Sequence, residues 1–110
     1  MDKRTDNRVK DFITEVAKQN PGLVTAYLFG SYSKKSQTEE SDIDIALIIE
    51  HLNDLDKFDL QVRLMLLAPG FDIRIEPHLF SMEDFNTGNP FINEVKRTGI
   101  EIKPQNFKIA

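Results

Sequence analysis

The sequence predicts a single α/β or α+β domain, in which helices cover a small β-sheet. Segments with helical periodicity alternate with short apolar segments along the chain, as in domains that pack helices on a sheet. The chain has 110 residues with 40% hydrophobic content, enough for one modest core but not for a second domain. We expect residues 1–103 to form the domain and residues 104–110 a loose C-terminal tail.

The N-terminal third predicts a helix followed by a strand. Apolar residues at positions 9, 12, 13, 16 and 17 repeat with the spacing of one helix face. Pro21 and Gly22 then end the helix. Residues 23–29 are short, β-branched and aromatic, which predicts a buried strand that ends at Gly30. The polar residues 31–41 predict a loop.

The middle third predicts a second strand and a second helix. Residues 42–49 predict a strand buried on both faces, because residues 45–49 are all apolar. Residues 53–68 predict a helix capped by Asn53 or Asp54 and ended by Pro69.

This second helix has two apolar faces, which lie nearly opposite each other. Either neighbouring elements cover both faces, or one face meets a partner protein or a second copy of the chain. The two faces consist of Leu55, Phe58, Val62, Met65 and Leu66, and of Leu60, Leu64 and Leu67.

The C-terminal third predicts a third strand, two short helices and a fourth strand. Residues 71–76 alternate apolar and charged side chains, so we expect a strand with Asp72, Arg74 and Glu76 on one face. The remaining predicted elements are a short helix at 82–85 capped by Ser81, a helix at 91–97 ended by Gly99, and a strand at 100–102.

The composition disfavours several classes of function. The net charge is −4 and the sequence has no basic stripe, which disfavours a nucleic-acid partner. The chain has no cysteine, which excludes disulfides and thiolate metal sites. The first residues lack the apolar core of a signal peptide, and no apolar run approaches the roughly 18 residues that span a bilayer. We therefore expect a soluble cytoplasmic protein.

The most informative pattern is Gly30 and Ser31, then ten residues, then Asp42 and Asp44 at the start of an apolar strand. Gly30 has no Cβ, so backbone N–H groups there can approach phosphate oxygens, and the Ser31 hydroxyl adds a donor. Two aspartates two residues apart on a strand point the same way and can bind divalent cations about 3.5–4 Å apart. The pattern predicts a site for a metal-bound nucleoside triphosphate, with Mg²⁺ as the hard cation that carboxylates prefer.

A third carboxylate is expected, because two aspartates leave the metals under-coordinated. Asp72 and Glu76 both fall on the third predicted strand, and we expect Asp72 to bind metal and to accept the proton of the nucleophile. Glu76 remains the alternative. Arg74 either neutralises the triphosphate or forms a structural ion pair.

These residues resemble the minimal nucleotidyltransferases of the DNA polymerase beta superfamily, over about residues 9–103. The resemblance implies a nucleotidyltransferase fold with a mixed sheet, two Mg²⁺ ions and ATP as substrate. It implies that Gly30 and Ser31 hold the triphosphate and that Asp42, Asp44 and Asp72 bind the metals. One position departs from the family pattern, because Lys35 stands where many members have a second glycine, and we expect a reshaped loop there.

The resemblance also implies a function. Small members act as antitoxins beside HEPN-domain toxins and transfer AMP to a tyrosine hydroxyl of the toxin. The alternative is a non-catalytic antitoxin that neutralises its partner by binding alone. A metal-dependent glycosyltransferase is disfavoured, because its sugar-nucleotide domain is much larger than this chain.

Overall fold

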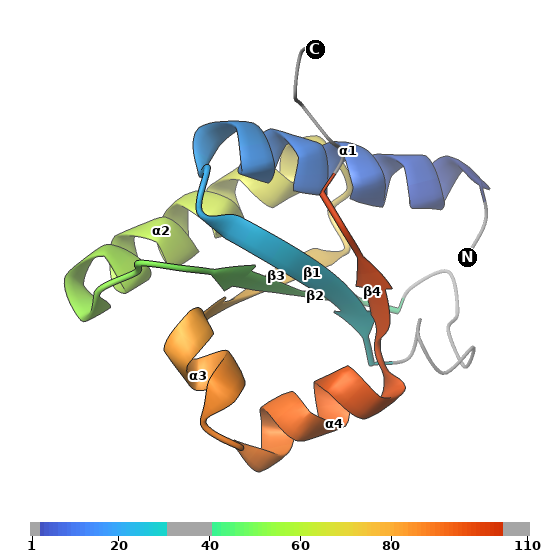
Figure 1. The fold of residues 1–110 in the computed structure, drawn as a ribbon. Helices are drawn as coiled ribbons and strands as arrows, with labels where there is room; N and C mark the ends of the chain where they lie inside the picture. The colour runs from blue at the N-terminus through green and yellow to red at the C-terminus, as the bar shows by residue number, and fades with distance from the viewer. Residues whose placement is uncertain (1–2, 31–40, 105–110) are drawn as a thin grey trace, which may run out of the picture.

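The computed structural model of the chain describes residues 3–30 and 41–104. Its centre is a mixed four-stranded sheet with the strand order β3-β2-β1-β4 (Figure 1). Strand β1 (Leu23–Phe29) pairs antiparallel with β2 (Ile43–Ile49) and with the short β4 (Ile100–Ile102). Strand β3 (Ile75–Ser81) forms one edge of the sheet and runs parallel to β2. The mixed sheet expected from the sequence is therefore confirmed.

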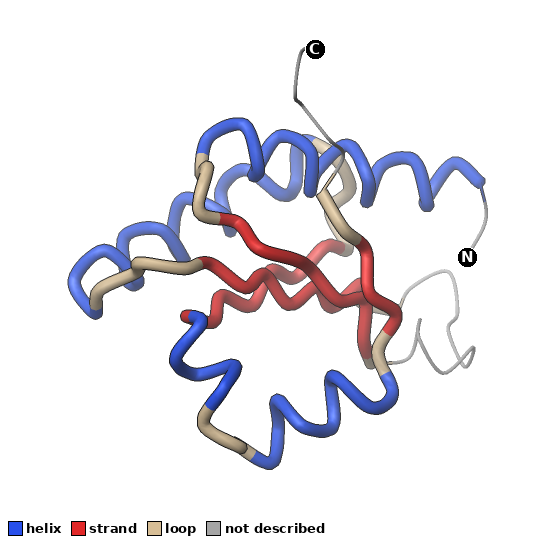
Figure 2. The backbone as a smooth tube through the Cα atoms, viewed as in Figure 1, coloured by secondary structure: helices blue, strands red, loops and turns tan. Residues whose placement is uncertain are grey.

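In the described part of the chain, four α-helices cover the two faces of this sheet. Helices α1 (Lys3–Gln19) and α2 (Asp54–Leu67) lie on one face, and α3 (Met82–Asn86) and α4 (Pro90–Thr98) lie on the other (Figures 1 and 2). A 3₁₀ turn, Ala68–Gly70, ends α2 at the proline and glycine that predicted its end. None of the helices in residues 3–30 and 41–104 is long and apolar enough to cross a membrane.

The main core lies between the sheet and the layer of α1 and α2. Alternate residues of β2 point into this layer, because successive side chains of a strand point to opposite faces. The buried side chains are Val9, Phe12, Ile13 and Val16 of α1, Ile43, Ile45, Leu47 and Ile49 of β2, and Leu64 of α2, all at most 4% exposed.

Most elements lie where the sequence predicts them. Asn53 is the cap of α2, since its side-chain oxygen accepts a hydrogen bond of 2.8 Å from the Asp56 N–H. Ser81 caps α3 and exchanges hydrogen bonds with Asp84 in a capping box. Of the loop predicted at 31–41 and the tail predicted at 104–110, residues 31–40, with Ser31 and Lys35, and residues 105–110 lie outside the described residues.

The predicted third strand at 71–76 is wrong: the strand begins at Ile75 and continues to Ser81. Residues 72–75 form a turn, in which an Asp72 carboxylate oxygen accepts a 2.9 Å hydrogen bond from the Arg74 N–H. Pro77 lies within β3, which is an edge strand, where a missing N–H costs no ladder bond. Ile73, expected to share a face with Ile75, is 85% exposed.

Only one of the two apolar faces of α2 is covered. Leu64 is buried, and Leu60 and Leu67 pack partly against the core. On the other face, the side chains of Leu55, Phe58, Val62, Met65 and Leu66 are exposed.

The two faces give a direct test of this packing. We expect Leu64→Ala to lower the free energy of unfolding by about 2–4 kcal/mol, because it removes buried methyl groups and leaves a cavity. Leu66→Ala, on the exposed face, is expected to change it by less than about 0.5 kcal/mol. Urea unfolding measures both values, and equal losses would contradict the position of α2.

Candidate active site

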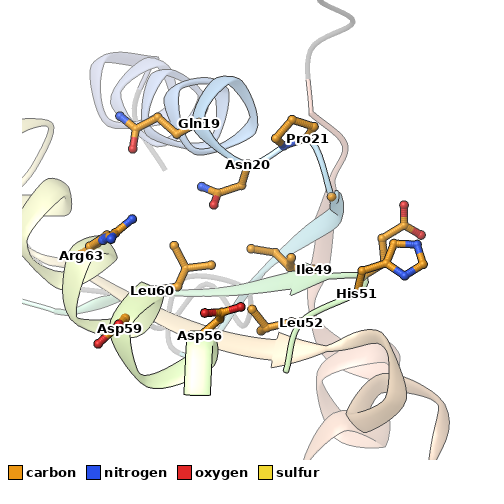
Figure 3. Close-up of a pocket in the computed structure, with 12 residues that line it drawn as sticks. Gln19, Asn20, Pro21, Ile49, His51, Leu52, Asp56, Asp59, Leu60 and Arg63 are labelled. Carbon is orange, nitrogen blue, oxygen red and sulfur yellow. The ribbon is translucent and has the colours of Figure 1, made fainter. Parts of the chain in front are cut away.

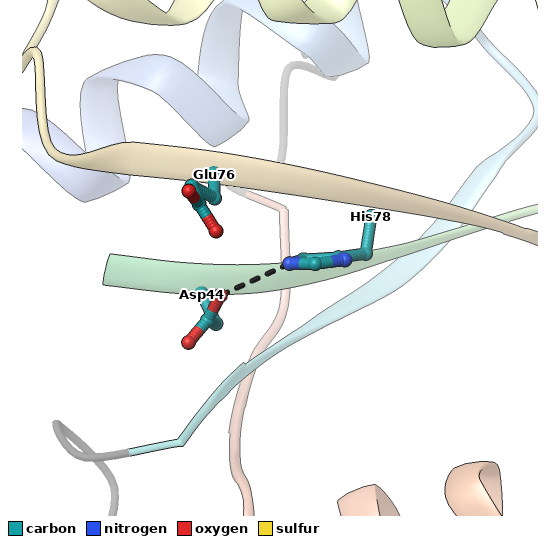
Figure 4. Close-up of side chains that lie close together, drawn as sticks. All are labelled: Asp44, Glu76 and His78. Atoms are coloured by element: carbon teal, nitrogen blue, oxygen red, sulfur yellow. Dashed lines mark hydrogen bonds and ion pairs between the residues drawn. The ribbon is translucent and has the colours of Figure 1, made fainter. Parts of the chain in front are cut away.

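Parallel pairing of β2 with β3 brings three polar side chains together on one face of the sheet. In this register Asp44 lies opposite Glu76, and Ala46 lies opposite His78. Asp44, Glu76 and His78 point toward one another (Figure 4), and their potential ligand atoms all lie within 4.8 Å of each other. This face is the one that α3 and α4 flank, opposite the core formed with α1 and α2.

A hydrogen bond and an aromatic contact orient His78. Its Nε2–H donates to Asp44 Oδ1 over 3.0 Å. The Phe29 ring meets the imidazole edge-on, with 5.1 Å between ring centroids. The Asp44 side chain is 23% exposed and that of His78 is 37% exposed, so both remain accessible to a ligand.

Negative charge is concentrated around Glu76. Desolvation, followed by the negative charges of Asp42 and Asp44, raises the pKa of the Glu76 carboxyl above its usual value. Asp42 therefore lies within electrostatic reach of the pair, although it is exposed. Three carboxylates that repel one another in this way form a donor set that suits a hard divalent cation such as Mg²⁺.

Gly30 lies directly against this cluster. Phe29 pairs with Asp44 in the β1–β2 ladder, which brings the next residue, Gly30, beside the aspartate side chain. A Cβ added at Gly30 would lie 2.6 Å from Asp44 Oδ2, and the backbone has a φ of +76°. The left-handed conformation favours glycine, and an added Cβ would force the Asp44 carboxylate to move. The glycine and the second aspartate of the sequence pattern meet in space, and Ser31 lies outside the described residues.

Asp72 lies on the other side of the sheet, in a different environment. It is 7% exposed, and its carboxylate accepts hydrogen bonds from the Arg74 guanidinium at 3.0 and 2.8 Å and from Arg8 at 3.1 Å. The bonds from Arg74 hold the pKa of the Asp72 carboxyl far below its usual range. Arg74 also donates to the Thr5 hydroxyl at 3.1 Å. Asp72 and Arg74 thus connect the turn before β3 to α1, and Asp72 does not share a face with Glu76.

The sequence ranked Glu76 second, and for His78 it favoured a structural role over a place at the border of the site. The place of both residues in the site follows from the position of β3, which could have been found from the alternation over residues 75–80. Ile75, Pro77 and Leu79 are buried, while Glu76 and His78 point to the opposite face. The sequence does not contain the parallel register of β2 and β3, which places Asp44 opposite Glu76. The contact between these residues therefore comes from the structure alone.

Comparison with known proteins agrees with this geometry. The family model for "Polymerase beta, Nucleotidyltransferase" matches residues 11–108 of the chain. A candidate protein adenylyltransferase of Methanocaldococcus jannaschii is 28% identical over 76 residues, which cover 68% of this chain and 74% of that protein.

Solved structures show the same fold. A candidate nucleotidyltransferase from Sulfolobus solfataricus superposes with a TM-score of 0.63 over 96% of this chain and 91% of its own, at 19% identity. A toxin–antitoxin structure with AMP-PNP gives a TM-score of 0.57 at 28% identity, over 84% of this chain and 70% of that chain. A mutant of the toxin–antitoxin MntA–HpeT gives 0.56 at 26% identity, with the same coverage.

The Asp72 ion pair predicts a pH-dependent contribution to stability. We expect Asp72→Asn to lower the free energy of unfolding at pH 7 by about 2–4 kcal/mol, because two arginines lose a buried partner. Since folding lowers the pKa of Asp72, its contribution is complete above the unfolded pKa of about 4 and is lost as the pH falls below it. Urea unfolding at pH 7 and pH 3 measures the difference.

The matched control is Asp6→Asn, which removes an ion pair with Lys10 within α1. We expect a loss below about 0.5 kcal/mol, because a pair of this kind on a helix surface contributes little. If wild type and Asp72→Asn lose the same stability between pH 7 and pH 3, the Asp72 ion pair does not have this role.

Proposed function

The chain belongs to the polymerase beta-like nucleotidyltransferase family, and from this premise we propose that it transfers AMP from ATP to a hydroxyl group of a partner protein. The observation that carries the proposal is the meeting of Gly30 with Asp44, which unites a phosphate-binding turn with a set of carboxylates. The name of the M. jannaschii relative supports a partner protein as the acceptor.

We assign the metal-binding carboxylates to Asp42, Asp44 and Glu76. Asp72, the residue that the sequence favoured, is replaced by Glu76 in this proposal, because Arg8 and Arg74 already occupy both Asp72 oxygens. Glu76 lies opposite Asp44 in the sheet and is accessible. Two Mg²⁺ ions bound by these residues would neutralise the triphosphate and lower the pKa of the attacking hydroxyl.

The residues of the chain then have defined tasks. Gly30, followed by Ser31, leaves space for the phosphate groups beside Asp44. The hydroxyl oxygen of the acceptor forms a bond to the α-phosphorus while the bond to the leaving pyrophosphate breaks. Glu76, as the third carboxylate of the site, accepts the proton of the hydroxyl. His78 holds the Asp44 carboxylate in position through its 3.0 Å hydrogen bond.

We further propose that the acceptor is a tyrosine of a HEPN-type toxin, which this protein would modify as an antitoxin. The likeness to toxin–antitoxin structures, one of them with the ATP analogue AMP-PNP, supports this partner and nucleotide. A non-catalytic antitoxin that acts by binding alone is the competing function, and the variants below separate the two.

The first test concerns the carboxylates. With α-phosphate-labelled ATP, Mg²⁺ and the purified toxin, we expect Asp44→Asn and Glu76→Gln each to reduce labelling of the toxin by about 100-fold or more. Asp72→Asn, assayed at a temperature where it is folded, is expected to retain labelling within about tenfold.

The pattern of loss distinguishes the assignments. A large loss in Asp72→Asn with full activity in Glu76→Gln would restore Asp72 as the third carboxylate. Full labelling by Asp44→Asn would end the enzymatic proposal. Protection of cells from the toxin by Asp44→Asn would favour neutralisation by binding.

The second test concerns Gly30. We expect Gly30→Ala to reduce labelling by about 10- to 100-fold, because the added methyl group displaces Asp44 and the left-handed backbone is strained. Gly88→Ala is the matched control, since Gly88 has a φ of +77° but nothing within 4 Å of an added Cβ. Equal effects of the two variants would assign the loss to backbone strain alone.

A further inference from the structure

The exposed face of α2 is an apolar surface that no other described residue covers. It consists of Leu55, Phe58, Val62, Met65 and Leu66, which we term the α2 stripe. Leu55 is 85% exposed and Phe58 72% exposed, far more than expected for large apolar side chains on a helix that packs on a sheet. A contiguous patch of this kind indicates an interaction surface.

The spacing of the stripe fits a helix as the bound element. Residues 55, 58, 62 and 65 follow one another at intervals of three, four and three, which is the a and d pattern of a helix–helix seam. Leu66 broadens the stripe at its C-terminal end. The stripe lies nearly opposite the buried Leu64, so it points away from the sheet.

Acidic residues border the stripe and line a hollow beside it. Asp56, Asp59 and Arg63, on the flank of α2, line an open hollow of about 320 Å³, which Glu50 and Asn20 also line (Figure 3). The charged side chains of this wall are three carboxylates and one guanidinium. The Lys57 ammonium does not offset them, because it pairs with Asp84 at 2.8 Å on the other flank of the helix.

These charges select among the possible occupants. A second copy of the chain would bring the same acidic border against this one. Among the described residues that line it, three carboxylates face one guanidinium, so like charges would oppose the pairing. A partner helix with basic residues along one edge would meet the acidic wall favourably. We propose that the α2 stripe and the adjoining hollow bind an amphipathic helix of a partner protein, with a lysine or arginine side chain entering the hollow.

This inference goes beyond the proposed function, on which it rests only for the existence of a protein partner. Asp44 and Glu76 lie on the sheet face opposite α2, so binding at the stripe leaves the catalytic cluster open. Binding needs neither ATP nor metal. Failure of the labelling assay would therefore leave this inference standing, and its own failure would leave the chemistry untouched.

The test uses a fluorescently labelled helical peptide of three heptads, with leucine at the a and d positions and lysine at the e and g positions. We expect its fluorescence anisotropy to rise on titration with the full chain. A matched peptide with glutamate in place of lysine should bind at least about tenfold more weakly, because it repels the acidic wall.

Two substitutions locate the binding surface. Phe58→Asp should weaken binding of the lysine peptide by about tenfold or more, although it adds a negative charge that would strengthen unspecific attraction. Ile73→Asp, at an equally exposed apolar side chain outside α2, should leave binding unchanged. Asp59→Asn should weaken binding of the lysine peptide several-fold and should not weaken binding of the glutamate peptide.

Three results would overturn the proposal. Equal binding of both peptides would show that the acidic wall does not select a basic helix. Equal effects of Phe58→Asp and Ile73→Asp would show that the peptide does not bind at the α2 stripe. Sedimentation equilibrium of the chain alone completes the test. A dimer that Phe58→Asp dissociates would make a second copy the occupant.

Discussion

The parallel pairing of β2 with β3 is the constraint on which the cluster of Asp44, Glu76 and His78 depends. It aligns Asp44 with Glu76, and a shift of one residue would turn Glu76 and His78 into the core and expose Ile75 and Leu79. Each buried Ile or Leu contributes about 1.5–3 kcal/mol, whereas repulsion between two carboxylates near the surface costs about 1–4 kcal/mol. Several buried side chains therefore hold together carboxylates that would separate on their own. Burial of the apolar side chains fixes the register of β2 and β3, and this register in turn places Asp44 beside Glu76.

Asp72 contributes to the same alignment from a distance. Its carboxylate holds the Arg74 N–H and guanidinium, and the Arg74 carbonyl accepts a 2.8 Å hydrogen bond from the Ile43 N–H at the start of β2. The turn thus sets the first residues of β2 and β3 side by side. Arg8, from α1, joins this arrangement across 64 positions of sequence. A residue that the sequence offered as a metal ligand instead has a structural role that positions Glu76.

The sequence predicted those parts of the fold that local patterns encode. The helical stripe of α1, the apolar run of β2 and the caps Asn53 and Ser81 each depend on neighbouring residues, and they lie as expected. The third strand was misplaced, because charged residues alternate with apolar ones over 71–76 and the pattern does not reveal that Asp72 is bound by Arg8. The sequence also left open whether Asp72 or Glu76 is the third carboxylate. Its choice depends on a strand register, which is a property of two distant segments.

The sheet separates two surfaces with different chemistry, and this separation restricts how a partner protein can be modified. Apolar side chains of β2 face α1 and α2, and Asp44 faces the opposite side. The thickness of the sheet therefore lies between the α2 stripe and the cluster of Asp44, Glu76 and His78. A helix seated on the stripe cannot itself present a hydroxyl group to Asp44. Under the proposed function, the acceptor tyrosine would therefore lie on a different segment of the partner that reaches around the edge of the sheet, or on another subunit of a partner oligomer. Strand β3 forms the edge nearest to Glu76 and His78, so the shortest route for that segment passes over β3 rather than over β4.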